Sequence, residues 1–175
     1  FIIAITGKNW FTKMELLREL SSTDQANGCC NRILFVMVRR SKLLPEGGHI
    51  EQVDFAPTIS RLKKAADFAQ AAGEIRRDSA AQEIWCAVYP ELSEGKPGLL
   101  GSVTSRAEAQ VARLSLLYAV LDCSRAIRPE HLYAALALWD YCEASARYIF
   151  GDALGHPEAD VVLQALRSKP EGLTR

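Results

Sequence analysis

The sequence has no excess of charge of one sign and no long hydrophobic run. Its 21 basic residues balance 21 acidic ones, so no overall field attracts the chain to nucleic acid or to a membrane surface. The apolar runs fall far short of the about 18 residues that a membrane-spanning helix needs. With 49% hydrophobic and 24% charged residues in 175 positions, the composition is that of a globular protein of roughly one domain, and no membrane partner is expected.

Cysteine pairs at metal-binding spacing are also missing. The chain has five cysteines, an odd count, and none of them forms a CxxC pair. A free cysteine in an apolar helix behaves as a small hydrophobe. The pattern therefore favours a reducing, cytoplasmic location over a zinc site or a disulfide framework. The five positions are Cys29, Cys30, Cys86, Cys123 and Cys142.

The chain lacks the parts of a complete nucleotide-hydrolysing site. It contains no GxxxxGK[ST] loop, and Gly7–Lys8 does not have that spacing. No apolar strand ends in paired acidic residues that could hold magnesium, and no nucleophile–base pair is evident. The histidines His49, His131 and His156 are scattered, with no Cys or carboxylate at ligand spacing. We therefore predict no metal site in this chain.

Two short apolar runs predict strands near the start of the chain. "FIIAIT" (1–6) and "ILFVMV" (33–38) are continuous and apolar, as in strands that are covered on both faces. Residues 12–20 predict a short helix between them, and 24–32 a turn or short helical stretch. Because Phe1 falls inside a strand-like run and no initiator Met precedes it, we expect a segment of a longer protein.

Strand signals nearly vanish after these two runs, and the rest of the chain predicts about five helices. Pro57, Asp78 and Pro129 mark helix starts, and a last helix begins near Pro157. The Gly/Pro-rich stretch 93–102 predicts a loop. The predicted fold is mainly α, with the end of an α/β sheet followed by a helical bundle.

The helix "SRAEAQVARLSLLYAVLD" (105–122) carries the first candidate site residues. Ser105 and Glu108 predict a capping box at its start, and its second half is apolar nearly all round. Arg106 and Arg113 share a stripe with Gln110 at helical spacing. Two interpretations stay open: the arginines cover a core helix with their stems, or a guanidinium faces an anion, to which its planar fork is suited. Of the two arginines, Arg113 is expected to have a structural role.

Two further positions stand at the ends of the predicted strands. Arg32 comes immediately before the run 33–38, where it either pairs with a carboxylate or is presented to a ligand on an adjacent subunit. Asn9 or Lys8 follows the run 1–6, and open α/β sheets bind ligands beyond the carboxyl ends of their strands.

These segments together resemble AAA+ helicases, especially the minichromosome-maintenance type. "NRILFVMVRR" is similar to their arginine-finger segment, and "TSRAEAQVARLSLLYAVLD" with "AIRPEHLYAALALWDY" resembles their lid. A closer resemblance is to a prokaryotic family of primase–helicase-like proteins carried by phages and plasmids. It rests on "TDQANGCCNRILFVMVRRSKLLPEGG", "YPELSEGKPGLLG" and "ALWDYCEASARYIFGDALG" and covers nearly the whole chain.

The resemblance implies a role in a larger DNA-replication ATPase. By position, Arg32 would be the catalytic arginine finger, Arg106 the sensor-2 arginine and Asn9 the sensor-1 residue, the last two binding nucleotide. The parent protein would use ATP and Mg, act on DNA and assemble into a ring, whereas this segment alone would bind no cofactor and be inactive.

The resemblance also implies a domain organisation. Residues 1–45 would be the C-terminal end of a P-loop ATPase α/β core, 46–155 a helical lid-like domain, and 156–175 the start of a winged helix-turn-helix. An alternative of another class is a non-catalytic helical interaction or DNA-binding module, which the neutral net charge favours slightly.

Overall fold

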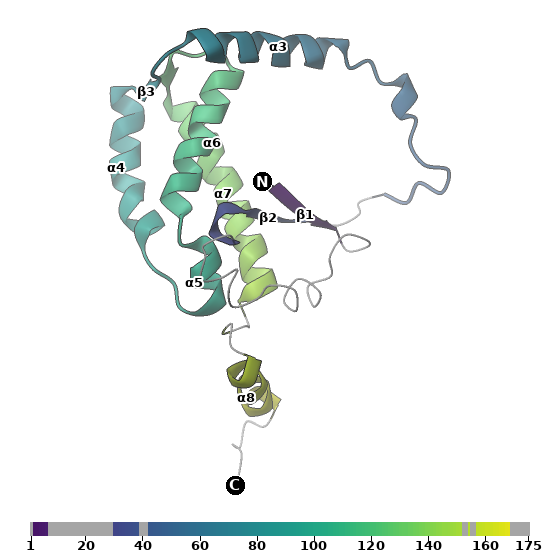
Figure 1. The fold of residues 1–175 in the computed structure, drawn as a ribbon, viewed down its shortest axis with the longest axis vertical. Coiled ribbons are helices and arrows are strands. Elements are labelled where there is room, and N and C mark those ends of the chain that lie inside the picture. Colours follow the sequence, from purple (N-terminus) through teal and green to yellow (C-terminus); the bar gives the residue numbers. More distant parts are fainter. Residues whose placement is uncertain (1, 7–29, 39–41, 152–153, 155–156, 169–175) are drawn as a thin grey trace. The chain divides into compact units, whose positions relative to one another are not determined.

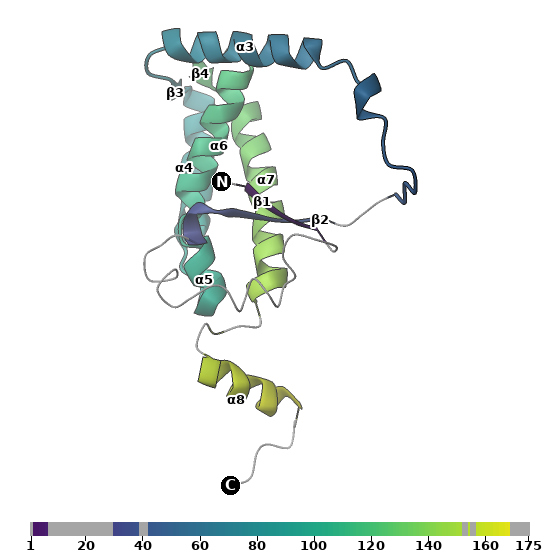
Figure 2. The same ribbon diagram turned by 45° about the vertical axis from the view of Figure 1, so that its right-hand side comes forward.

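The computed structural model describes residues 2–6, 30–38, 42–151, 154 and 157–168. Its described part is mainly helical, with two small parallel sheets (Figures 1 and 2). In chain order the elements are β1 (Ile2–Thr6), η1 (Cys30–Arg32), β2 (Leu34–Val38), η2 (Ile50–Gln52), α3 (Ala56–Ala71), β3 (Arg76–Arg77), α4 (Ser79–Ser93), α5 (Gly98–Thr104), α6 (Ala107–Leu121), β4 (Ala126–Ile127), α7 (Pro129–Phe150) and α8 (Pro157–Ser168). The mainly α fold class with a two-stranded parallel sheet is thus confirmed.

The chain divides into two compact units whose segments alternate along the sequence. The first unit gathers residues 1–39, 95–106 and 141–175, and the second gathers 40–94 and 107–140. The successive pieces implied by the resemblance, with boundaries at 45 and 155, stay a prediction. The units are discontinuous because α5 and the C-terminal end of α7 pack on β2 rather than on their neighbours in sequence.

The sheet of the first unit pairs the two strands that the sequence predicts. β1 and β2 run parallel, with Ile2 opposite Leu34 and Thr6 opposite Val38. In β2 only Leu34 and Phe35 are buried, and the rest of the strand is half-buried. Complete burial of β2 was therefore a wrong prediction, because within the described chain β1 is its only neighbouring strand.

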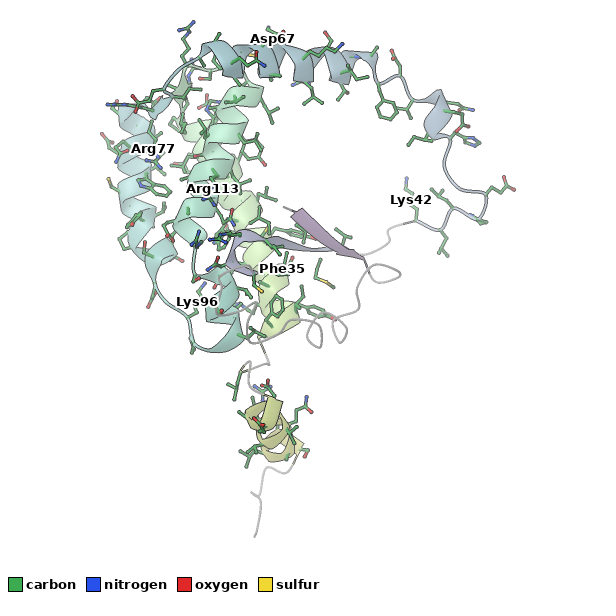
Figure 3. The ribbon with its side chains drawn as sticks, in the orientation of Figure 1. Phe35, Lys42, Asp67, Arg77, Lys96 and Arg113 are labelled. Carbon is green, nitrogen blue, oxygen red and sulfur yellow. The ribbon has the colours of Figure 1, made fainter. Side chains whose placement is uncertain are left out.

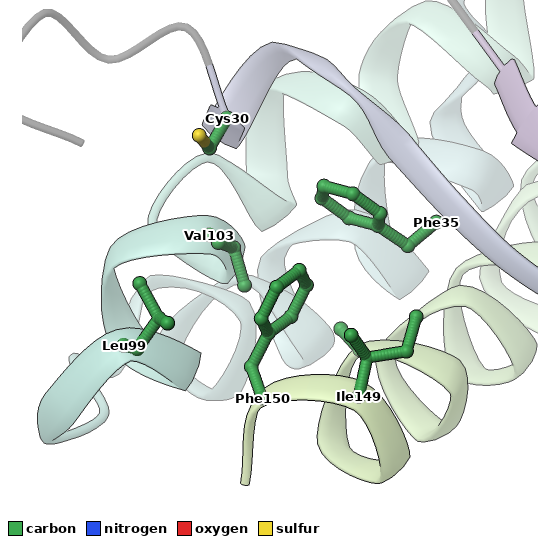
Figure 4. Close-up of a cluster of buried hydrophobic side chains, with 7 residues drawn as sticks. Cys30, Phe35, Leu99, Val103, Ile149 and Phe150 are labelled. Carbon is green, nitrogen blue, oxygen red and sulfur yellow. The ribbon is translucent and has the colours of Figure 1, made fainter. Parts of the chain in front are cut away.

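A cluster of buried apolar side chains joins β2, α5 and the end of α7 (Figure 4). The rings of Phe35 and Phe150 meet edge to face, with centroids 4.9 Å apart and planes at 78°. Such a pair adds stabilisation beyond the area that it buries. The cluster consists of Cys30, Phe35, Leu99, Val103, Ala146, Ile149 and Phe150.

Helix α5 corrects the prediction of a loop over residues 93–102. Pro97 precedes the helix in an extended conformation (φ −74°, ψ 161°), and Leu99 and Val103, four residues apart, both turn into the cluster. Gly101 has to lack a side chain, because a Cβ there would lie 1.6 Å from the carbonyl oxygen of Lys96. Tertiary packing thus makes a helix from a segment whose glycines and prolines locally favour a loop.

The predicted capping box at the start of the next helix is wrong. Ser105 has helical angles (φ −63°, ψ −2°) and ends α5, whereas an N-cap residue is extended. Its hydroxyl donates to the carbonyl of Ser102 at 3.0 Å. α6 begins two residues later at Ala107, with Glu108 in its first turn.

The second unit contains a parallel pair of two-residue strands that the sequence did not reveal. Arg76 lies opposite Ala126 and Arg77 opposite Ile127. The backbone N–H of Asp78 extends the pairing by donating to the carbonyl of Ile127 at 3.0 Å. Strands this short leave no periodic pattern, so the tertiary structure alone defines them.

Most other helix boundaries agree with the sequence. Asp78 caps α4, and its carboxylate accepts from the backbone N–H of Ala81 at 2.8 Å. α3 carries its proline in the first turn, and Gly73 follows it at φ 65°. α7 and α8 start at Pro129 and Pro157. The helix predicted over 12–20 lies outside the described residues, and among those described no helix is long and apolar enough to span a membrane.

Helix α6 is buried on one side only. Ala107, Val111 and Leu114 are among the buried residues of the helix. Leu116, Leu117 and Leu121 are 40%, 51% and 39% exposed, so the predicted all-round burial of the second half is wrong. The helix packs against α3, α4 and β4, and α3 lies across one of its ends (Figures 1 and 2).

Candidate functional site

Arg32 is the last residue of η1 and stands immediately ahead of β2. The buried thiol side chain of Cys30 anchors this turn in the apolar cluster, and the backbone N–H of Ile33 closes it on the carbonyl of Cys30 at 3.2 Å. The Arg32 side chain is exposed. An anchored turn therefore presents a guanidinium to solvent at the amino end of β2.

Arg106 lies in the turn between α5 and α6 and is half-buried. It precedes α6, so the predicted stripe of Arg106, Gln110 and Arg113 on one helix is wrong. Gln110 is buried on α6, whereas Arg113 is exposed there (Figure 3). The capping geometry explains the error, because the helix was expected to start at Ser105.

A hydrogen bond brings the segments of Arg32 and Arg106 together. The side-chain amide of Asn31 donates to the Ser105 hydroxyl at 3.0 Å, across 74 positions of sequence. Because Ser105 gives its own proton to the Ser102 carbonyl, its oxygen is free to accept. Arg32 directly follows Asn31 in the sequence, and Arg106 directly follows Ser105. The Asn31–Ser105 hydrogen bond therefore ties together the two backbone segments that carry the arginines.

The two arginines differ from Lys96 and Arg147 of the same unit in their electrostatic surroundings. Within the described part of the chain, neither Arg32 nor Arg106 forms an ion pair. Lys96 and Arg147, by contrast, both bind the carboxylate of Glu143, at 2.5 Å and 2.8 Å. Burial alone would raise the pKa of Glu143, but the hydrogen bonds and charges of Lys96 and Arg147 outweigh it and lower that pKa.

The Lys96–Glu143–Arg147 group was missed by sequence reasoning. Glu143 and Arg147 have the i,i+4 spacing of a helical ion pair, which a search of α7 would have found. Lys96 is 47 positions away from Glu143, so only the fold brings it there. The group fastens the start of α5 to α7 on the same unit that carries Arg32 and Arg106.

The direction of the strands places Arg32 away from the edge where a ligand was predicted. β1 and β2 are parallel, so Arg32 marks the amino edge of the sheet, whereas Lys8 and Asn9 follow β1 beyond its carboxyl end. A strand of this length spans roughly 15 Å. Lys8 and Asn9 themselves lie outside the described residues, so their predicted contact with nucleotide stays a prediction.

The buried histidine of the second unit has a structural role. Nδ1 of His131 accepts from the backbone N–H of Arg128 at 3.0 Å, which leaves the ring proton on Nε2, 3.3 Å from a carboxylate oxygen of Asp122. The exposed His49 pairs with Glu51. Across the described ranges, no group of three His, Cys, Asp or Glu side chains could hold a metal ion.

No protein family model matches the sequence, and neither a similar curated protein nor a similar solved structure was found.

Proposed function

We propose that this chain is part of an AAA+-like ATPase of a mobile-element DNA-replication protein, helicase-like in activity. In this proposal Arg32 is an arginine finger and Arg106 a sensor-2 arginine. ATP, Mg, the phosphate-binding loop and DNA contacts belong to the parent protein, and the segment alone is inactive. The observation that carries the proposal is the Asn31–Ser105 hydrogen bond, which holds together the segments of two arginines that form no ion pair with any described residue.

Phosphoryl transfer is a reaction in which the two arginines, Arg32 and Arg106, could stabilise developing negative charge. Negative charge on the transferred phosphoryl group is stabilised by positioned guanidinium groups, and an arginine finger contributes about 10³–10⁵ in rate. Arg32 stands at the amino edge of β2, opposite the edge where an α/β sheet holds its own ligand. We therefore expect Arg32, together with Arg106 of the adjoining segment, to serve the nucleotide of a neighbouring subunit in a ring.

The apolar cluster would link the arginines to the helical part of the chain. Cys30 and Val103 belong to the same cluster, so we expect the turn with Arg32 and the helix before Arg106 to move together. A contact between either guanidinium and nucleotide would then be transmitted to α5 and the end of α7. Closing and opening around ATP is a common use of such a connection.

The test is a contrast among three alanine variants of the full-length protein. Arg32→Ala and Arg106→Ala should each reduce ATP turnover at least about a hundredfold, with circular dichroism and thermal unfolding unchanged. Arg113→Ala is the control, because Arg113 is exposed and forms no ion pair in the described chain. Full turnover by Arg106→Ala would remove the sensor role, and steady turnover by the isolated 175-residue segment would remove the proposal.

Exposed apolar side chains favour the alternative, a non-catalytic interaction or DNA-binding module. Between positions 43 and 62, large hydrophobic side chains are exposed at Leu43 (78%), Leu44 (52%), Ile50 (71%), Val53 (52%), Phe55 (47%), Ile59 (49%) and Leu62 (53%). Apolar exposure concentrated in one segment of the chain is a feature of contact surfaces. A GxxxxGK[ST] loop and an acidic strand end encoded upstream in the same gene would support the ATPase, and their absence would support the module.

A further inference from the structure

Arg77 in β3 is held flat against an aromatic ring of the second unit. Its guanidinium carbon lies 4.0 Å from the centroid of the Trp85 ring, and Trp85 meets Tyr89 edge to face at 5.5 Å. Figure 3 shows Arg77 beside α4, the helix that carries both aromatic residues. The stack fixes the plane and direction of the guanidinium before any ligand arrives.

Among the described residues, the same guanidinium forms no ion pair. Its Nε is sealed from solvent and forms no hydrogen bond, and within the described part of the chain no carboxylate pairs with Arg77. Burial lowers the pKa of Arg77, and attraction to the sulfur of Cys86 opposes that effect only in part. The neighbouring Arg76 differs, because it is exposed and binds Glu74 at 2.9 Å.

A half-buried cation without a counter-charge is costly unless something else compensates for its lost water. The contact with the face of Trp85 compensates for part of that loss. The sealed Nε leaves the two terminal nitrogens as the atoms that a ligand can reach. Their planar, forked donors match the two oxygens of one carboxylate.

We propose that the tip of Arg77, stacked on Trp85, binds a single carboxylate. The charge of the chain segment that carries Arg77 favours this class of ligand. Positions 74–94 combine two basic residues, Arg76 and Arg77, with five acidic ones, namely Glu74, Asp78, Glu83, Glu91 and Glu94. The acidic excess of this segment disfavours a nucleic acid or a doubly charged phosphate more strongly than a singly charged carboxylate. The inference is independent of the ATPase proposal, since Arg32 and Arg106 belong to the other unit.

The indole N–H signals of the tryptophans provide the measurement. The chain has three Trp residues, and a Trp85→Phe variant assigns the signal of Trp85 in a ¹⁵N NMR spectrum. On titration with sodium acetate, against sodium chloride at equal ionic strength, the Trp85 signal should shift and saturate. Arg77→Gln should raise the half-saturating acetate concentration at least about tenfold, and the matched variant Arg76→Gln should change it less than about twofold.

Two further arms complete the experiment. Arg77→Lys keeps the positive charge but loses the forked pair of donors, so this variant should bind acetate more weakly than the unmodified chain. Because the charge is kept, the same variant also tests whether the loss of binding in Arg77→Gln has a cause other than misfolding. A capped peptide with one glutamate distinguishes the sources: tighter binding than acetate indicates a protein partner, and equal binding a small organic acid. Absence of a saturable shift, an unchanged titration in Arg77→Gln, or tighter binding of inorganic phosphate than of acetate would overturn the proposal.

Discussion

Replacing Phe150 by alanine tests whether the apolar cluster of the first unit positions the candidate site. Phe150 is fully buried and meets the ring of Phe35 at 4.9 Å. Removing a buried phenylalanine ring costs about 3–5 kcal/mol of unfolding free energy through lost transfer energy and the cavity left behind. In a chain of this size each kcal/mol lowers the melting temperature by about 2–4 °C, so we expect a decrease of roughly 6–20 °C.

The effect should be local as well as global. α5 has seven residues, too few for a stable helix without tertiary packing, and Leu99 and Val103 hold it in the same cluster as Phe150. Phe150→Ala should therefore speed amide hydrogen exchange in α5 before the chain unfolds. Tyr133→Ala is the control on the same helix, because Tyr133 is 57% exposed and its loss should change stability by no more than about 0.5 kcal/mol.

A small change would refute the reasoning. If Phe150→Ala lowers the free energy of unfolding by less than about 1 kcal/mol and leaves exchange in α5 unchanged, the cluster does not hold α5 in place. A double-mutant cycle with Phe35→Leu and Phe150→Leu isolates the ring pair itself. We expect a coupling of about 0.5–1.5 kcal/mol.

Two further predictions concern the same unit. The pKa of Glu143 is lowered in the folded chain, so its ion pairs stabilise the fold fully at pH values above its ordinary pKa near 4.5 and lose that contribution as the pH falls through the folded value. Glu143→Gln should destabilise the chain by about 1–2 kcal/mol at pH 7 and by much less at pH 3, as measured by urea unfolding; equal losses at both pH values would contradict this. Gly101→Ala should displace α5, because its Cβ would lie 1.6 Å from the Lys96 carbonyl oxygen; we expect a loss of about 2 kcal/mol or more and weaker binding of Lys96 to Glu143, whereas Gly95→Ala, where a Cβ meets no atom within 4 Å, should be nearly neutral.

Local sequence chemistry determined the elements whose signals lie within a few residues of one another. The strands β1 and β2 follow from continuous apolar runs, although in β2 only Leu34 and Phe35 are fully buried. The caps at Asp78 and Gly73 follow from short-range preferences, a side chain that accepts a backbone N–H and a residue that tolerates positive φ. The mainly α composition was predictable for the same reason.

Only the tertiary structure decided the features that depend on distant partners. Residues 98–104 carry loop-forming glycines, yet they form α5 because Leu99 and Val103 are buried against β2 and α7. Ser105 lost its predicted capping role because α5 continues up to it, and its hydroxyl became the acceptor for Asn31 instead. The stack of Arg77 on Trp85 depends on the pairing of β3 with β4, two strands too short to leave a pattern. In each case either the stabilising partner is tens of positions away in the sequence, or the strand involved is too short to show a periodic pattern. The local sequence therefore does not predict these features.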